Sequence, residues 1–248
     1  MTQSTDAGGP GDEREEAILT VDGVASGYGE VQILYDLSFH LNEGEIVCMI
    51  GPNGAGKSTV LRTIFGLLEP WDGHISLRGD DITAMDPEDI VRKGMGYVPQ
   101  IDNVFRSLTV IENLKMGGVA RGDPEPIIEE LLENFKLLRG KEKTKAENLS
   151  GGQRQILALA RALVMEPEVL LVDEPSAGLA PSIVDDVIDD IERINDLGTT
   201  ILMVEQNARQ GLAISDRGIV LDQGQVEFED DAETILESPK IRELYLGG

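Results

Sequence analysis

The sequence IVCMIGPNGAGKST, residues 46–59, decides the fold of this chain. Residues 46–50 are continuously apolar, as expected of a β-strand that is buried on both faces of a sheet. Residues 51–58 match the pattern G-x-x-x-x-G-K-[ST], and a helical pattern follows over residues 57–68. A strand, a glycine-rich loop and a helix in this order predict a loop that binds phosphate groups.

The spacing of this motif suits phosphate for physical reasons. Its glycines let the backbone wrap so that N–H groups point inward, and the start of the helix adds the positive end of its dipole. Lys57 reaches the outer phosphates, and the hydroxyl of Ser58 is a ligand for Mg²⁺. The residues expected to bind nucleotide here are Gly51, Pro52, Asn53, Gly54, Ala55, Gly56, Lys57, Ser58 and Thr59.

A second group of candidate residues follows another apolar strand. Residues 169–172 are apolar and are followed directly by Asp173 and Glu174. Ligands of open α/β sheets bind at the carboxyl ends of the strands, so we expect Asp173 to reach the phosphate site as a second contact for Mg²⁺. Glu174 would lie near the terminal phosphate, where a carboxylate can orient or deprotonate water. Two solvated acids at a strand end are the alternative in so acidic a chain.

The composition excludes several classes of function. The chain has 248 residues, 41% of them hydrophobic, and a net charge of −25 from 21 Lys and Arg against 46 Asp and Glu. Such a surface repels nucleic-acid phosphates, so we expect no nucleic-acid partner. The single cysteine, Cys48, excludes an internal disulfide and a cysteine-based zinc site. The chain has neither an apolar run of about 18 residues nor a basic, apolar leader, so we expect no membrane span and no secretory signal.

The order of patterns along the chain predicts an α/β domain. Short β-type runs alternate with helical patterns, which indicates a largely parallel sheet. Residues 100–166 are mostly helical in pattern and are interpreted as an insertion between two strand-containing parts, residues 17–99 and 167–248. The polar, charged residues 1–16 are expected to form a disordered acidic tail.

The segment Leu149-Ser150-Gly151-Gly152-Gln153 provides a further candidate anion site. Ser150 is positioned to cap a helix, and the two glycines leave backbone N–H groups open at its positive end; a plain helix cap is the simpler interpretation. This pentapeptide resembles the signature of the ATP-binding subunits of ABC transporters. The resemblance runs from about residue 18 to the C-terminus. It implies a single ATPase domain with a P-loop NTPase (RecA-like) core, an antiparallel β subdomain and an inserted helical signature subdomain.

Other positions match the same family in order. The resemblance implies that Tyr28 stacks on adenine, and that Gln100 links Mg²⁺ and the attacking water to the membrane partner. Residues 176–179 match the loop after the catalytic glutamate. The resemblance also implies a head-to-tail pair of ATPase subunits, in which each ATP lies between the P-loop of one subunit and the signature of the other.

One position departs from the general family pattern. The family usually has a histidine after the strand expected here at residues 199–204, whereas this chain has Gln206. Its two histidines, His40 and His74, lie far upstream. We expect Gln206 to occupy the position that senses the γ-phosphate, as a hydrogen-bond donor without a titratable proton.

The segments 204–208 and 241–247 resemble one of the two ATPase subunits of branched-chain amino-acid importers. The sequence thus predicts an ATPase that energises import by ATP-driven dimer closure, with ATP and Mg²⁺ bound and Glu174, Gln206 and Lys57 as catalytic residues. The implied partners are a second ATPase subunit, transmembrane permease subunits and, indirectly, a substrate-binding protein, so we expect the chain at the cytoplasmic face of the membrane. The alternatives are an importer of urea, amides or other amino acids, a soluble ABC ATPase outside transport, and a non-hydrolysing regulatory module.

The acidic residues are spread along the whole chain rather than gathered in one tail. A net charge this large weakens the compact state through self-repulsion unless salt screens it. The composition therefore indicates a cytoplasm that holds very high salt, as in salt-accumulating halophiles.

This interpretation predicts a strong effect of salt on stability. On the helix expected over residues 181–197, Asp185 and Asp189, and likewise Asp186 and Asp190, are like-charge pairs four positions apart, each of which costs about 0.2–0.5 kcal/mol when unscreened. We expect the thermal unfolding midpoint to rise steeply from about 0.1 M to about 1 M KCl, because the screening length falls from about 10 Å to about 3 Å. A parallel series in sucrose controls for stabilisation without screening. A midpoint that is flat or falls with KCl contradicts the high-salt interpretation.

Overall fold

The computed structural model describes residues 17–101, 103–239 and 241. The strands are β1 (Ala17–Tyr28), β2 (Val31–Asn42), β3 (Ile46–Ile50), β4 (Asp72–Leu77), β5 (Asp80–Asp81), β6 (Met95–Val98), β7 (Val169–Asp173), β8 (Thr200–Val204), β9 (Arg217–Asp222) and β10 (Gln225–Asp231). The helices are α1 (Lys57–Ile64), α2 (Pro87–Arg92), α3 (Val110–Gly117), α4 (Glu125–Asn134), the 3-10 turn η2 (Ala146–Asn148), α5 (Gly151–Leu163), α6 (Pro181–Asp196), α7 (Ala208–Ala213) and α8 (Ala232–Glu237).

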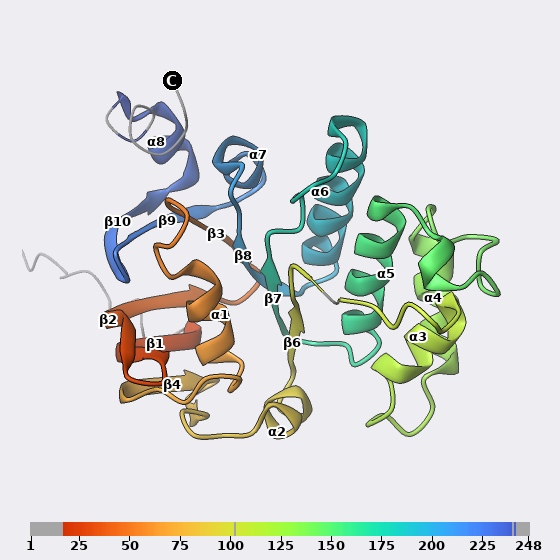
Figure 1. The fold of residues 1–248 in the computed structure, drawn as a ribbon, viewed down its shortest axis with the longest axis horizontal. Helices are drawn as coiled ribbons and strands as arrows, with labels where there is room; N and C mark the ends of the chain where they lie inside the picture. The colour runs from red at the N-terminus through yellow and green to blue at the C-terminus, as the bar shows by residue number, and fades with distance from the viewer. Residues whose placement is uncertain (1–16, 102, 240, 242–248) are drawn as a thin grey trace, which may run out of the picture.

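In these residues the strands form two sheets (Figure 1). The smaller sheet has the order β2-β1-β4-β5 and is antiparallel. The larger sheet has the order β10-β9-β3-β8-β7-β6, and its strands are parallel apart from β10, which runs antiparallel to β9. Both the α/β class and the largely parallel sheet are confirmed.

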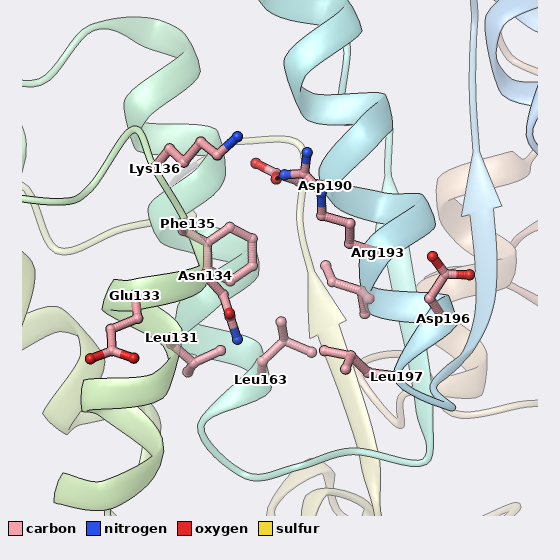
Figure 2. A pocket seen from close by; sticks show the side chains of 11 residues that line it. Leu131, Glu133, Asn134, Phe135, Lys136, Leu163, Asp190, Arg193, Asp196 and Leu197 are labelled. Atoms are coloured by element: carbon pink, nitrogen blue, oxygen red, sulfur yellow. Dashed lines mark hydrogen bonds and ion pairs between the residues drawn. The ribbon is translucent and has the colours of Figure 1, made fainter.

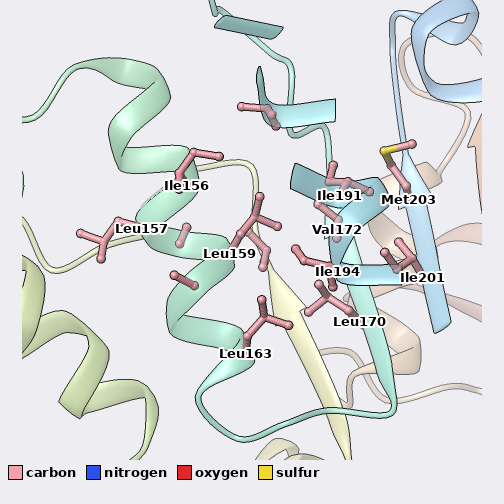
Figure 3. Close-up of a cluster of buried hydrophobic side chains, with 14 of the residues drawn as sticks. Ile156, Leu157, Leu159, Leu163, Leu170, Val172, Ile191, Ile194, Ile201 and Met203 are labelled. Atoms are coloured by element: carbon pink, nitrogen blue, oxygen red, sulfur yellow. The ribbon is translucent and has the colours of Figure 1, made fainter. Parts of the chain in front are cut away.

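The larger sheet separates two apolar cores. Strands β3, β7 and β8 are buried at every position, as their continuous apolar runs predict. Successive side chains of a strand point to opposite faces, so Cys48 packs into the core that contains α5 and α6, whereas Met49 packs into the core that contains α1 and the antiparallel sheet. Figure 3 shows the first core, in which side chains of α5 meet those of β7, α6 and β8: Ile156, Leu159, Leu163, Leu170, Val172, Ile191, Ile194 and Met203.

The helices expected between residues 108 and 165 lie between β6 and β7 along the chain, as α3, α4 and α5 with η2 between the last two. Figure 1 shows α3, α4 and α5 gathered at one end of the molecule, opposite the antiparallel sheet. Each of α3 and α5 starts with a capping box, formed by Thr109 with Glu112 and by Ser150 with Gln153. The insertion is therefore helical, as predicted.

Several helix ends differ from the prediction. The helix expected over 57–68 ends at Ile64, because Gly66 turns the chain at a φ of +71°, where a side chain would also collide with the Met85 carbonyl oxygen. The helix expected over 124–138 ends at Asn134, and the one expected from residue 151 to 165 ends at Leu163. An apolar pattern continues through a turn as readily as through a helix, so it does not mark the last helical residue.

Other elements have no counterpart in the sequence prediction. These are β5, β6, α2, α7 and α8, which span two to six residues each. Such short segments carry too few positions for a clear period. The acidic tail predicted over 1–16 lies outside the described residues, as do residues 242–247 of the segment that resembles the importer subunits. Within the described ranges, no helix is long and apolar enough to span a bilayer.

A cavity of about 450 Å³ opens between the end of α4 and the end of α6 (Figure 2). Its walls include Leu131, Phe135 and Leu163, and it is also bordered by Asp190. The side chain of Asp190 is only 8% exposed and accepts a hydrogen bond of 2.8 Å from Arg193. Burial raises the pKa of Asp190 to about 6, against the opposing effect of Arg193. Asp190 is therefore no solvated surface acid, unlike the other three aspartates of the predicted like-charge pairs, which are exposed.

Asp190 should leave a signature in the pH dependence of stability. Its pKa is higher in the folded chain than in the unfolded chain, so its contribution is present at low pH and is lost as the pH rises from about 4 to about 6. Urea unfolding should show that wild type loses stability between about pH 5 and pH 7.5, and that Asp190→Asn loses less over that range, by on the order of 1 kcal/mol. Asp186, Asp189, Glu133 and Lys136 also border or face this carboxyl group, so Asp189→Asn is the matched control for the loss of one charge. Identical pH profiles of the two variants would contradict the role of burial.

Candidate functional site

The glycine-rich loop joins β3 to α1 and forms the wall of a cavity. Gly51 has a φ of +153°, and a side chain there would collide with the Leu221 carbonyl oxygen, so only glycine fits. No side chain caps α1 at Gly56, which leaves the N–H groups of its first turn open to an anion. The cavity measures about 240 Å³ and is lined by Ile33, Asn53, Gly54, Gly56, Lys57, Ser58, Thr59 and Glu174.

Lys57 is the buried cation of this cavity. Its ammonium group donates hydrogen bonds to the carbonyl oxygens of Gly51 at 2.8 Å and Pro52 at 3.2 Å. Burial lowers the pKa of Lys57, and the charges of Glu174 and Asp173 act in the opposite direction. The lysine is thus held beneath the loop by contacts that a phosphate group, which is a stronger acceptor, can replace.

Two strand ends meet beside this lysine. The Ser58 hydroxyl donates a hydrogen bond of 2.9 Å to Asp173, which ends β7 and is 2% exposed. The amide of Gln100, which follows β6, donates a hydrogen bond of 2.7 Å to Glu174. The structure therefore brings together four residues predicted from separate motifs: Ser58, Gln100, Asp173 and Glu174.

Burial governs the acid–base properties of the two carboxyl groups. It raises the pKa of Asp173, against the effect of the Ser58 hydrogen bond. It also raises the pKa of Glu174, against the charge of Lys57. Glu174 has a φ of +46°, a left-handed conformation that costs a residue with a side chain about 1–3 kcal/mol and needs support from its surroundings.

Tyr28 lies against α1 at the edge of the site. Its ring is 42% exposed, its hydroxyl is 3.5 Å from the Thr59 hydroxyl, and it accepts a hydrogen bond of 3.2 Å from Arg62. Sequence reasoning missed Arg62, although its position four residues after Ser58 on the same helix could have indicated it. It also missed Tyr97, whose buried hydroxyl has no hydrogen-bond partner among the described residues and whose pKa burial raises to about 12.

The signature segment is not part of the same cavity. None of the residues 149–153 lines it. Ser150 and Gly151 are exposed at the start of α5, whereas Leu149 and Gly152 are buried. The capping box of Ser150 and Gln153 fixes the helix start and satisfies two of its backbone N–H groups.

Gln206 follows β8 and is exposed. It lines a different opening, of about 420 Å³, together with Ser176, Leu179, Asn207 and others. That opening and the P-loop cavity lie at the same edge of the sheet, because Glu174 donates a backbone hydrogen bond of 2.9 Å to the carbonyl of Val204. Gln206 is therefore close to the site in the fold but does not line the cavity around Lys57.

The fold and this cavity define a P-loop protein that binds a nucleoside triphosphate. The model of the ABC transporter family matches residues 34–177. The chain is 41% identical to the "High-affinity branched-chain amino acid transport ATP-binding protein BraG" of Pseudomonas aeruginosa, over 93% of this chain and 100% of that protein. It is 42% identical to the "Probable branched-chain amino acid transport ATP-binding protein LivF" of Archaeoglobus fulgidus, over 90% and 95% of the two chains.

More distant relatives agree on the class. The "Lipopolysaccharide export system ATP-binding protein LptB" of Escherichia coli is 34% identical over 93% of this chain and 98% of that protein. Among solved structures, the ADP conformation of an ATP-binding cassette of an ABC transporter superposes with a TM-score of 0.84 at 29% identity, covering 94% of this chain and 99% of that one. The chain belongs to the ABC transporter family, as an ATP-binding subunit with ATPase activity.

Proposed function

We propose that this chain hydrolyses ATP to drive an importer of branched-chain amino acids. The observation that carries the ATPase part is the pair of contacts beside Lys57, Ser58 to Asp173 and Gln100 to Glu174, at the cavity lined by the P-loop. The cargo part is supported by the 41% identity to BraG along that protein's whole length. The cargo itself would be selected by other subunits.

The oxygen atoms beside Lys57 fit Mg²⁺. A hydroxyl, a carboxylate and an amide oxygen, from Ser58, Asp173 and Gln100, are the hard ligands that this ion prefers. The described residues contain no cluster of three or more acidic, His or Cys side chains that would hold a metal alone, which agrees with an ion completed by water and substrate phosphates. When bound, Mg²⁺ neutralises charge on the outer phosphates.

The chain's own residues would bind the nucleotide and activate the attacking water. Lys57 and the N–H groups of the loop and of α1 bind the phosphates, and the ring of Tyr28 offers a face to the adenine. The Glu174 carboxylate accepts the proton of the attacking water while Gln100 holds that carboxylate in place. Burial raises the pKa of Glu174, which makes its carboxylate a stronger base than a solvated one.

A second subunit would complete the site. Ser150 and Gly151 are exposed at the N-terminal end of a 13-residue helix, so a γ-phosphate held by another subunit can reach them. The domain division at about residues 100 and 166 then corresponds to a core that holds ATP and a helical part that contacts the partner's ATP.

A permease helix would dock on the apolar groove next to Gln100. The groove measures about 280 Å³ and is lined by Phe65, Tyr97, Phe105 and Met116, with the Arg161 guanidinium 5.1 Å from the Phe105 ring centre. Phe105 and Met116 are 45% and 44% exposed. Tyr97 lines this groove and lies three residues before Gln100, which donates a hydrogen bond to Glu174. Movement of such a helix would therefore be transmitted through Gln100 to Glu174. This docking would hold the chain at the cytoplasmic face of the membrane.

The ATPase assignment predicts opposite effects for two substitutions. Glu174→Gln keeps the shape of the site but removes the base, so turnover should fall by about 100-fold or more while ATP accumulates in a stable dimer. Lys57→Ala removes a phosphate contact and should weaken ATP binding itself. Size-exclusion chromatography with ATP and Mg²⁺, alongside phosphate release, measures both. Turnover of Glu174→Gln within a few fold of wild type would contradict the assignment.

Gln206 has no titratable proton, so the pH dependence of ATPase activity should lack the step that a histidine at this position would cause. Its amide can donate to a phosphate oxygen but cannot act as acid or base. At saturating ATP and fixed salt, wild type should show no step attributable to an imidazole between about pH 6 and 7, and Gln206→His should add one. Gln206→Ala should lower kcat more than ATP affinity. If Gln206→Ala matches wild type at every pH, Gln206 does not sense the phosphate.

The cargo is tested by uptake in cells that lack this gene. Loss of leucine, isoleucine and valine uptake, restored by wild type but not by Glu174→Gln, is the expected result. Uptake of urea is measured in the same strains, because loss of that activity alone would favour the urea importer instead. Mass spectrometry of the membrane subunits that co-purify with the chain identifies the permease independently.

A further inference from the structure

Glu205 is a buried carboxylate that the roles described so far leave unused. It follows β8 directly and is 1% exposed. Its own backbone N–H donates a hydrogen bond of 3.2 Å to the carbonyl of Met49 in β3. The residue is therefore fixed at the carboxyl edge of the sheet, between the P-loop strand and the strand that ends in Asp173.

The carboxylate of Glu205 accepts four hydrogen bonds from neutral donors. Oε1 accepts from the backbone N–H of Ser176 at 3.0 Å, and Oε2 accepts from the Ser176 hydroxyl at 2.8 Å. Oε2 also accepts from the backbone N–H groups of Gln206 at 3.1 Å and Asn207 at 3.4 Å. One side chain thus joins the loop that follows Glu174 to the loop that carries Gln206.

The first of these loops holds Glu174 in its left-handed conformation. The N–H of Ala177 donates to the carbonyl of Glu174 at 3.1 Å and closes a tight turn. Ser176 is one of the two central residues of that turn, and its backbone N–H and its hydroxyl both donate to Glu205. A backbone conformation of this kind persists only where its surroundings determine it, and Glu205 supplies two of the contacts that do so.

We propose that Glu205 is a positioning residue that sets Glu174 and Gln206 relative to one another by holding both loops on one carboxylate. It does not line the cavity around Lys57 and acts through Ser176 and the Gln206 backbone. A carboxylate is required because all four partners are donors, whereas an amide would direct its own N–H groups at some of them. The inference rests on the proposed ATPase function of Glu174.

This role predicts a selective loss of the chemical step. In the full chain, Glu205→Gln should lower kcat by about tenfold or more and leave the KM for ATP within about twofold. Ser176→Ala, which keeps the backbone donor and removes the hydroxyl, should lower kcat by a few fold, and Ser176→Thr, which keeps a hydroxyl, should restore it. In the Glu205→Gln background Ser176→Ala should add little, because the partners act through one contact.

Glu45→Gln is the matched control. Glu45 is also a buried carboxylate, 9% exposed, which accepts a hydrogen bond of 2.7 Å from the Asn42 backbone and, unlike Glu205, forms an ion pair with Arg217; it precedes β3 at the opposite end of the sheet. We expect it to lower the thermal midpoint without a selective loss of kcat. Ser176→Ala keeps the proposal testable if Glu205→Gln does not fold.

Three results separate the outcomes. A kcat loss in Glu205→Gln no larger than in Glu45→Gln, or equal changes in kcat and KM, would overturn the positioning role and leave a structural one. Full additivity of Glu205→Gln and Ser176→Ala would overturn it too. If wild type releases no phosphate, or Glu174→Gln turns over normally, the proposed function fails instead, and that failure is visible before any Glu205 variant is compared.

Discussion

The whole site depends on the register of three parallel strands. Met49 of β3 pairs with Val204 of β8, and Val204 pairs with Asp173 of β7, so these three residues form one row across the sheet. β7 and β8 end at this row, and β3 continues for one residue, Ile50, before the P-loop begins. The P-loop, Glu174 and Glu205 are therefore brought to one edge of the sheet, although the P-loop lies more than a hundred residues before the two glutamates along the chain. A slip of one residue in this row would turn every core side chain to the wrong face.

The same row explains why some of the site could be predicted from the sequence. The P-loop is a motif of backbone geometry, and its glycines and Lys57 have fixed positions in any chain that carries it. Asp173 and Glu174 could be predicted because an apolar strand of the parallel sheet ends directly before them. Glu205 follows β8 in the same way, yet an isolated acid in a chain of this acidity carries no such signal. Its role emerges only from the partners that the fold brings to it.

Contacts between elements that are distant along the chain could not be predicted, for a related reason. The spacing along α1 could have marked Arg62, but nothing in the spacing joins Arg62 to Tyr28 on β1. Tyr97 lies on β6, a strand of four residues that has no clear alternating pattern. The predicted helix ends were wrong for the same reason. The end of α1 is determined by the approach of the chain at Met85 rather than by the apolar pattern. Long-range packing decides these features, and a single sequence does not encode it locally.

Acidic side chains outnumber basic ones around the site, so a triphosphate needs additional positive charge in order to bind there. Burial raises the pKa values of Asp173, Glu174 and Glu205, because each gives up water for a few hydrogen bonds. The positive charge beside these three carboxyl groups comes from Lys57, and burial lowers the pKa of that lysine. A triphosphate adds further negative charge, which under the proposed function would be offset by a divalent cation beside Ser58 and Asp173 and by the open N–H groups of the loop and α1. Under the proposed function, the signature helix of a second subunit would add another set of N–H groups without adding a side-chain charge, so closure of the pair would depend on the presence of the γ-phosphate.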